Sequence, residues 1–216
     1  MQTLLPTTKH RRGRLTARQE RSLASPGPSL LLAEDLATNP AVTGTDPLVL
    51  DIGFGSGEAV VALAEGKPDE TILAVDMHTP GIGDLLASID ERSLGNIRIV
   101  DADVRLVLGA LPPGRLCGVR TFFPDPWPKK RHHRRRLITA EFAEVLAIRV
   151  DGGGFWHIAT DWPDYAESIV DVVSTVPSWT GGIISRPTWR PETRYERRGR
   201  AAGREPIDLW FERVPA

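Results

Sequence analysis

From Leu48 onward, short apolar runs alternate with segments that carry apolar residues at helical spacing. The first pair is "PLVLDIG" followed by "SGEAVVALAEG", and four further pairs follow before about residue 185. Strands that alternate with helices of this length are typical of βαβ units, whose strands lie parallel in a doubly wound sheet. The sequence therefore predicts an α/β, Rossmann-like sheet that is mostly parallel.

The expected elements follow one another along residues 47–176, and one more strand is expected after them. The strands are predicted at 47–53, 71–78, 97–103, 118–125 and 153–161. The helices are predicted at 56–66, 81–93, 104–111, 136–150 and 164–176. After an irregular stretch rich in Pro, Arg and Trp, "PIDLWFERV" at 206–214 is expected as an antiparallel C-terminal strand.

Length and composition favour one folded domain preceded by an arm. Residues 1–45 mix basic residues with Pro, Ser and Thr, and we expect a flexible or loosely packed arm there and a single domain over 46–216. No apolar run is long enough for a membrane span, so a cytoplasmic protein is expected. Cys117 is the single cysteine, which excludes an internal disulfide, and it is expected to be a small buried side chain rather than a nucleophile.

The charges are segregated although they nearly cancel. The chain has 27 Lys and Arg against 28 Asp and Glu, yet nineteen of the basic residues lie in the windows 9–21, 129–136 and 186–204. A single run of this kind is equally well explained as solvated surface. Three such runs that coincide with the motifs below predict a polyanionic partner, provided that they fold onto one face.

An aspartate lies at the end of each of the five expected parallel strands. Ligand sites in such sheets lie beyond the carboxyl ends of the strands. This rule makes candidates of all five aspartates, which are Asp51, Asp76, Asp103, Asp125 and Asp161.

The loop "LDIGFGSGE" indicates a cofactor site. Gly53, Gly55 and Gly57 allow a tight turn and a close approach of the backbone to a ligand. A nicotinamide fingerprint requires a glycine where this chain has Glu58, and a phosphate would be repelled by Asp51. S-adenosylmethionine carries no phosphate and two cationic groups, so it suits this loop better. Asp76 is then placed to accept the ribose hydroxyls and Asp103 the adenine amino group.

The segment "FFPDPWPKKRHHRRR" indicates an acceptor site. Two prolines fix the backbone around Asp125, and six of the eight residues from Lys129 to Arg136 are Lys or Arg. Cations at the start of the expected helix oppose its dipole, which nucleic-acid phosphate would offset. His132 and His133 are expected to contact phosphate or solvent, and no metal site is expected. Farther on, Thr193 and Glu196 are spaced so that one helical turn would present both toward a base, and guanine offers the two donors that a carboxylate accepts.

These motifs together resemble the bacterial tRNA (guanine-N7)-methyltransferases. The resemblance covers roughly residues 46–214 and is carried, in order, by "LDIGFGSG", "AVDMHTPGIG", "FFPDPWPKKRHHRRR", "HIATDW" and "RPETRYERRG". It implies a class I methyltransferase fold, S-adenosylmethionine as methyl donor, and N7 of the variable-loop guanosine of tRNA, conventional position 46, as acceptor.

The resemblance also implies roles for individual residues. Cofactor contacts would come from Asp51, Gly53, Gly55, Gly57, Asp76, Asp103 and Asp125, and Asp125 would also be the catalytic residue. Substrate contacts would come from Lys129, Asp161, Thr193, Arg194, Tyr195 and Glu196. RNA contacts would come from Arg131, His132, His133, Arg134, Arg135 and Arg136. The family usually has glutamate at the position of Asp51 and often at that of Asp76, so cofactor contacts there would be altered.

Three other functions stay open on the sequence. An amino-methyltransferase acting on adenine or cytosine would have a second proline where this chain has Trp127. A nicotinamide-dependent dehydrogenase is disfavoured by Glu58. A basic RNA-binding module with an inactive cofactor fold would bind tRNA without methyl transfer. The sequence leaves open whether the protein is a monomer or a homodimer.

Overall fold

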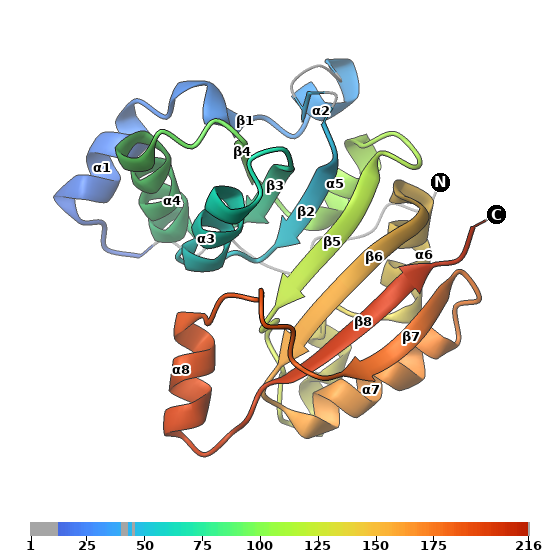
Figure 1. Ribbon diagram of the computed structural model, residues 1–216. Helices are drawn as coiled ribbons and strands as arrows, with labels where there is room; N and C mark the ends of the chain where they lie inside the picture. The colour runs from blue at the N-terminus through green and yellow to red at the C-terminus, as the bar shows by residue number, and fades with distance from the viewer. Residues whose placement is uncertain (1–12, 40–42, 45, 216) are drawn as a thin grey trace. The chain divides into compact units, whose positions relative to one another are not determined.

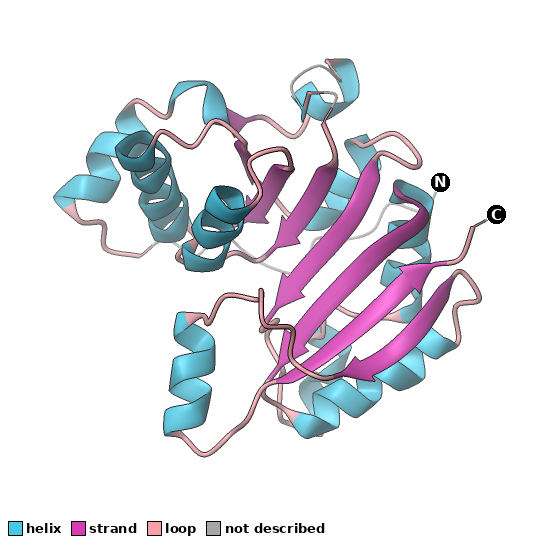
Figure 2. Ribbon diagram, viewed as in Figure 1, coloured by secondary structure: helices cyan, strands magenta, loops and turns pink. Residues whose placement is uncertain are grey.

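The computed structural model describes residues 13–39, 43–44 and 46–215 (Figures 1 and 2). The chain divides into two compact units, Met1–Pro112 and Pro113–Ala216. Each unit contains four strands together with helices that pack against them. Lys9, Arg11 and Arg12 of the first basic window lie outside the described residues.

The first unit contains a parallel half-sheet in the order β1-β4-β3-β2. Its strands are β1 (Leu30–Leu31), β2 (Leu48–Ile52), β3 (Thr71–Asp76) and β4 (Ile97–Asp101). All five residues of β2 are buried, as expected for a strand that is covered on both faces. In Figure 1, α3 and α4 cover one face of these strands, and α5 lies behind them.

Among the described residues of the first unit, three helices match expected segments and two lie in the segment expected to be an arm. They are α1 (Ala17–Ala24), α2 (Asp35–Thr38), α3 (Glu58–Gly66), α4 (Thr79–Arg92) and α5 (Val104–Ala110), with a 3-10 turn at Gly27–Ser29. Gly66 is the last residue of α3, and Lys67 follows as the cap.

Part of the expected arm is folded. Thr16 and Gln19 form a capping box that starts α1, and α1 lies alongside α4 (Figure 1). Arg18 joins the two helices through Asp84 at 3.3 Å and Glu91 at 2.7 Å. The prediction of a loosely packed segment is therefore wrong for α1, because Arg18 has acidic partners on α4.

The second unit contains a mixed half-sheet in the order β5-β6-β8-β7. Its strands are β5 (Leu116–Phe122), β6 (Val150–Thr160), β7 (Trp179–Ile184) and β8 (Ile207–Arg213). β5 and β6 are parallel, whereas β8 runs antiparallel to both β6 and β7. The Rossmann-like class with an antiparallel C-terminal strand is confirmed, and β7 is a strand that the sequence did not predict.

Glycines in β5 and β7 allow close approaches within this sheet. A Cβ at Gly118 would lie 2.1 Å from the ring of Phe155 on β6, and a Cβ at Gly181 would lie 2.0 Å from the carbonyl oxygen of Trp210 on β8. Gly181 therefore allows β7 to pair closely with β8. Cys117, beside Gly118, is half-buried.

The basic block does not form the start of the expected 136–150 helix. It forms its own 3-10 helix, η3 (Lys130–Arg135), and α6 (Ala140–Arg149) starts only after Thr139, whose Oγ1 accepts the N–H of Phe142. The remaining helices are α7 (Pro163–Ser174) and α8 (Arg194–Ala201). Because Glu141 occupies the first turn of α6, the expected conflict between cations and that helix dipole does not arise.

Among the described residues, no helix combines the length and the apolar character that crossing a membrane requires.

Candidate active site

The glycine loop of the first unit has the conformation that only glycine adopts readily. Gly53, Gly55 and Gly57 have φ angles of 74°, 61° and 79°, and Gly57 is the N-cap of α3. The start of α4 lies directly against this loop, because a Cβ at Gly81 would be 1.8 Å from the carbonyl oxygen of Gly55. The loop is thus a backbone cradle at the start of α3, as the sequence predicts.

Asp76 fixes the shape of the cradle. Its Oδ2 accepts the N–H of Gly55 at 2.8 Å, and its Oδ1 accepts the N–H groups of Met77 at 2.7 Å and His78 at 3.0 Å. An ionised carboxylate has about four acceptor positions, so these bonds leave little capacity beyond one position on Oδ2. The sequence predicted ribose contacts for Asp76 and gave no sign of this role in the loop.

Asp51 and Asp103 lie at the same edge of the half-sheet as Asp76. The register places Ile52 opposite Val75 and Asp76 opposite Asp101, so the carboxyl ends of three neighbouring strands are aligned. Asp51 is 4% exposed and Asp103 is 6% exposed. Asp103 caps α5 by accepting the N–H of Arg105 at 2.9 Å. The structure therefore brings the three predicted acids of the first unit together.

Asp125 lies in a bent loop at the end of β5 in the second unit. The non-glycine residues Phe123 and Trp127 on either side of it have φ angles of 55° and 46°. Such angles are uncommon for bulky residues and persist only where the surroundings impose them. The N–H of Phe123 donates to the carbonyl oxygen of Ala159 on β6 at 2.7 Å. The side chain of Asp125 is exposed between these two bends.

The 3-10 helix η3 packs against this loop. The ring of His132 meets the ring of Trp127 edge-on at 5.9 Å, and the guanidinium of Arg135 lies over the same indole at 4.9 Å. Lys129, Arg131 and Arg134 are exposed, as expected for RNA contacts.

Arg136 differs from the rest of the block and requires a correction. Its side chain is only 5% exposed, and it contacts the backbone of Pro126 and the side chains of Asp164 and Tyr165. It is therefore withdrawn from the predicted RNA-contacting set. His133 lies 3.9 Å from Asp164 and is half-buried.

Asp161 follows β6 at the same edge as Asp125, because Phe122 pairs with Ala159 in parallel register. Its Oδ2 accepts the Nε–H of Arg204 at 2.7 Å. Helix α8 approaches closely here, since a Cβ at Gly199 would lie 2.5 Å from that oxygen. The structure thus brings Asp125, Asp161 and α8 to one edge of the second unit.

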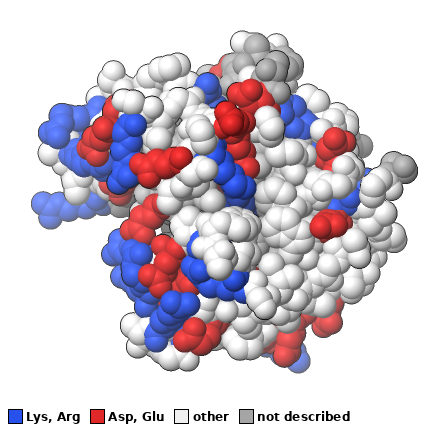
Figure 3. All heavy atoms as spheres, in the orientation of Figure 1, with Lys and Arg blue, Asp and Glu red and all other residues white. Residues whose placement is uncertain are grey.

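The outer face of α8 is basic. Arg194, Tyr195 and Arg198 are exposed, and Figure 3 shows Lys and Arg side chains gathered over this helix. Arg194 and Tyr195 therefore lie on the solvent-exposed face of α8.

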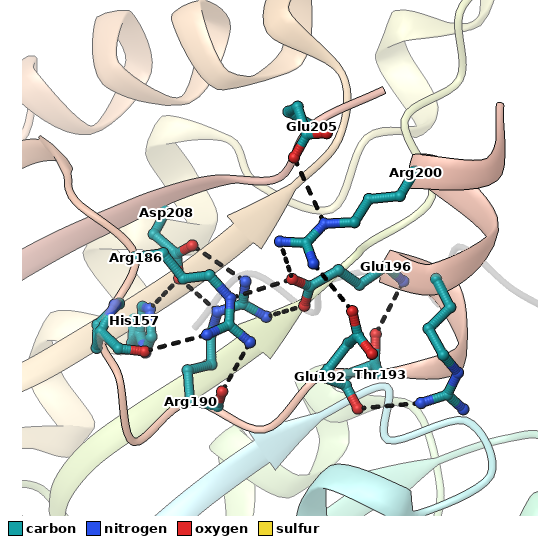
Figure 4. Close-up of polar contacts among 11 residues, drawn as sticks. His157, Arg186, Arg190, Glu192, Thr193, Glu196, Arg200, Glu205 and Asp208 are labelled. Carbon is teal, nitrogen blue, oxygen red and sulfur yellow. Dashed lines mark hydrogen bonds and ion pairs between the residues drawn. The ribbon is translucent and has the colours of Figure 1, made fainter. Parts of the chain in front are cut away.

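The inner face of α8 contradicts the prediction that Thr193 and Glu196 face a base. Thr193 caps the helix by accepting the N–H of Glu196 at 3.1 Å. The carboxylate of Glu196 is fully buried and lies 2.7 Å from Arg190 and 3.0 Å from Arg186 (Figure 4). Its acceptor positions are used by arginines of this chain, so it is a structural anchor of α8 rather than a residue open to guanine.

Glu196 belongs to a buried polar network that the sequence did not predict. Arg190 also contacts Asp208 on β8 at 2.7 Å, and Asp208 lies 2.7 Å from the Nε2 of His157 on β6 (Figure 4). Burial lowers the pKa of His157, the nearby Asp208 opposes this, and Arg190 and Arg120 reinforce it. The neutral imidazole is therefore favoured. Only the alternation of apolar and charged residues in "HIATD" and "PIDLW" could have hinted at these buried partners.

Comparisons with known proteins agree with this geometry. A family model described as "Putative methyltransferase" matches residues 45–209. A tRNA (guanine-N(7)-)-methyltransferase of Streptomyces avermitilis is 46% identical over 94% of this chain and 73% of its own length. One from Escherichia coli is 39% identical over 94% of this chain and 89% of its own.

Solved structures share the fold at low sequence identity. The 16S rRNA (adenine(1408)-N(1))-methyltransferase from Catenulisporales acidiphilia, solved with its cosubstrate S-adenosylmethionine, has a TM-score of 0.57 at 16% identity. The match covers 85% of this chain and 92% of that one. Together with the sequence relatives, the glycine cradle and the aspartates at the strand ends lead to one assignment. The chain belongs to the tRNA (guanine-N(7)-)-methyltransferase family.

Proposed function

We propose that this protein transfers the methyl group of S-adenosylmethionine to N7 of the variable-loop guanosine of tRNA, conventional position 46. The observation that carries the proposal is the joint presence of a glycine cradle lined by acids in one unit and the Asp125 loop beside exposed cations in the other. The names of its sequence relatives, tRNA (guanine-N(7)-)-methyltransferases, support it. Such a reaction belongs in the cytoplasm, where tRNA is found.

The residues of the first unit fit S-adenosylmethionine. The left-handed glycines expose backbone rather than side chains to a ligand, and apart from its chain neighbours no atom of the described residues lies within 4 Å of a Cβ built at Gly53. Asp51, Asp76 and Asp103 offer carboxylates, which suit a ligand with cationic and hydroxyl groups and no phosphate. When bound, the cosubstrate supplies a methyl group on a sulfonium. Asp76 would hold one ribose hydroxyl through Oδ2 while it keeps the N–H of Gly55 in place.

The second unit provides the acceptor side. Guanine N7 has an exposed lone pair, so no proton has to be removed before attack. The contribution of the protein is then alignment of N7 and stabilisation of the positive charge that moves onto the base. Asp125, an exposed carboxylate in a bent loop, would supply this stabilisation rather than act as a general base.

The tRNA would be held by cations around that loop. The contacts we propose are those of Lys129, Arg131, Arg134 and Arg135 with phosphates, assisted by His132 and His133. Arg194 and Tyr195 on the outer face of α8 would contact the substrate nearby. Asp161, at the same edge of the sheet as Asp125, would be a further substrate contact.

The decisive experiment is methyl transfer from labelled S-adenosylmethionine to unmodified tRNA, with the product identified by nucleoside mass spectrometry. We expect 7-methylguanosine at one position. Asp125→Asn should lower kcat by about 100-fold, the usual scale for loss of a charge-stabilising group, while tRNA affinity changes little. Asp171→Asn, an exposed aspartate on α7, is the matched control and should retain full activity.

Other outcomes would identify a different function. Full turnover by Asp125→Asn at saturating tRNA and cofactor would remove Asp125 from the reaction. A methylated adenine or cytosine would point to an amino-methyltransferase. Salt-sensitive tRNA binding without any methyl transfer would leave an RNA-binding module.

A further inference from the structure

Arg136 is the one buried residue of the basic block at 129–136. Its side chain is 5% exposed, whereas Arg131, Arg134 and Arg135 are exposed. An arginine is rarely buried unless its donors are satisfied, so the partners of Arg136 indicate its role.

Those partners lie in three directions. The Nε–H of Arg136 donates to the carbonyl oxygen of Pro126 at 2.9 Å, and Nη2 donates to Oδ2 of Asp164 at the start of α7. The guanidinium carbon lies 4.6 Å from the ring centroid of Tyr165, which is fully buried. The hydrogen bond from Arg136 holds the pKa of the Asp164 carboxyl below its usual value, and burial raises the pKa of Tyr165 to about 12. Arg136 therefore connects the loop that follows β5 to α7.

This connection matters because the loop has few donors of its own. Pro124 and Pro126 enclose Asp125 and lack N–H groups, so the backbone on either side of Asp125 cannot donate hydrogen bonds. One end of the loop is fixed by the bond from the N–H of Phe123 to Ala159. At the other end, the carbonyl group of Pro126 is held by Arg136. Pro126 directly follows Asp125, so a shift of that carbonyl would move the carboxylate.

We infer that Arg136 is a positioning residue for Asp125: it holds the carbonyl group of Pro126, braced by Asp164 and Tyr165, and thereby fixes the Asp125 carboxylate for the reaction. The inference rests on the proposed function, in which Asp125 stabilises charge on the base. Its alternative is that Arg136 contacts an RNA phosphate like its exposed neighbours.

Two substitutions of Arg136 separate these roles. A lysine keeps the charge that a phosphate needs but cannot form the forked contacts to Pro126 and Asp164. For a positioning residue, Arg136→Lys and Arg136→Gln should both lower kcat by about 10- to 100-fold, since small displacements are costly in catalysis. The tRNA dissociation constant and its salt dependence should stay at wild-type values.

A matched arginine provides the comparison. Arg134→Gln, in the same 3-10 helix but exposed, should weaken tRNA binding and reduce the slope of log affinity against log salt by about 1. Asp164→Asn removes the charged brace of Arg136 at a side chain that is 68% exposed, so it should fold normally. It should lower kcat in the same direction as Arg136→Lys, by a smaller factor.

A second measurement does not depend on activity. Hydrogen exchange followed by mass spectrometry should show faster exchange in the peptide that covers residues 122–130 for Arg136→Lys and Asp164→Asn than for wild type, because the loop loses its brace. The same peptide in Arg134→Gln should exchange at the wild-type rate.

Three results would each contradict a positioning role of Arg136. It is overturned if Arg136→Lys keeps kcat near the wild-type value, if Arg136→Gln reduces the salt slope by about 1, or if exchange in 122–130 is unchanged. If wild type does not methylate guanine N7 while the exchange results hold, the proposed function fails and the bracing of this loop by Arg136 stands.

Discussion

At the scale of single residues, the buried His157 is a point where pH acts on the second unit. Its ring is 0% exposed and lies between Phe122 at 5.0 Å and Trp189 at 5.3 Å. Its Nε2 contacts the carboxylate of Asp208, while the positive charges of Arg190 and Arg120 disfavour protonation of the imidazole. The lowered pKa means that the folded protein keeps this imidazole neutral at pH values where the unfolded chain protonates it.

The sign of the pH dependence follows from this difference. Above the unfolded pKa, about 6.5, both states are neutral and the contribution to stability is complete. As the pH falls below 6.5 toward the lower folded pKa, the unfolded state gains a proton first, so the free energy of unfolding should fall by at most about 1.4 kcal/mol per pH unit from this residue. Urea denaturation at a series of pH values from neutral to mildly acidic measures it. His157→Gln should remove this part of the slope, and an identical slope in both proteins would show that His157 does not titrate on unfolding.

The sequence predicted the conformation of the glycine loop in the first unit better than the role of Arg136 in the second unit. Gly53, Gly55 and Gly57 have spacing that demands a tight turn whatever the rest of the fold, so their conformation followed from the sequence. Arg136 reads as one more cation in a run of cations. Its charged partner is Asp164, which is distant in sequence, and no local pattern encodes that contact.

At the scale of elements, α8 shows two faces with different tasks. Its inner face carries Glu196, held by Arg186 and Arg190, and its outer face presents Arg194 and Arg198 to solvent. The spacing of Thr193 and Glu196 correctly predicts one helical turn. It could not show which way that turn faces, because the arginines that bury Glu196 precede the helix in an irregular segment.

Removing the charge of Glu196 should destabilise the protein strongly. Glu196→Gln leaves the buried Arg190 and the half-buried Arg186 with a neutral partner, which should lower the free energy of unfolding by about 3 kcal/mol. Glu192→Gln is the matched control, because its contact with Arg200 joins side chains that are 40% and 42% exposed and should contribute about 1 kcal/mol or less. Chemical denaturation compares the two. Equal losses would show that the network around Glu196 contributes no more than a surface ion pair.

The elements themselves were predicted where a hydrophobic pattern is local. The strands before each aspartate and the helices α3, α4, α5 and α7 match the expected segments within a few residues. The segments that were missed, β1, β7 and η3, are short or rich in glycine and charge. Their conformation comes from partners such as β4 and β8 rather than from their own periodicity.

At the scale of the whole molecule, the net charge does not show which cations remain available to bind a partner. Several arginines of the basic windows are engaged within the protein: Arg18 with Glu91, Arg136 with Asp164, Arg186 and Arg190 with Glu196, and Arg204 with Asp161. Exposed cations on η3 and α8 remain as the candidates for phosphate contacts. A count of basic residues in the sequence therefore overstates the surface offered to a polyanion.

This distribution predicts tRNA binding that weakens steeply with salt. With at least four exposed arginines in contact with phosphate, the logarithm of the association constant should fall with log salt at a slope of about −3 or steeper. Titrations of tRNA at several salt concentrations measure the slope. The combined variant Arg131→Gln, Arg134→Gln, Arg194→Gln and Arg198→Gln should flatten it, whereas Arg18→Gln, whose arginine pairs with Asp84 and Glu91, should leave it unchanged. A wild-type slope near zero would contradict electrostatic binding.

The left-handed backbone at Phe123 and Trp127 affects how the protein binds its substrate. Those two residues hold the Asp125 segment in a shape that a free peptide would seldom visit, and the fold imposes that shape before any RNA arrives. The segment therefore loses its conformational entropy when the protein folds, not when RNA binds. Because the Asp125 carboxylate is already held in place, binding of tRNA does not have to order this loop. A larger part of the favourable interaction energy then contributes to the affinity and to the rate.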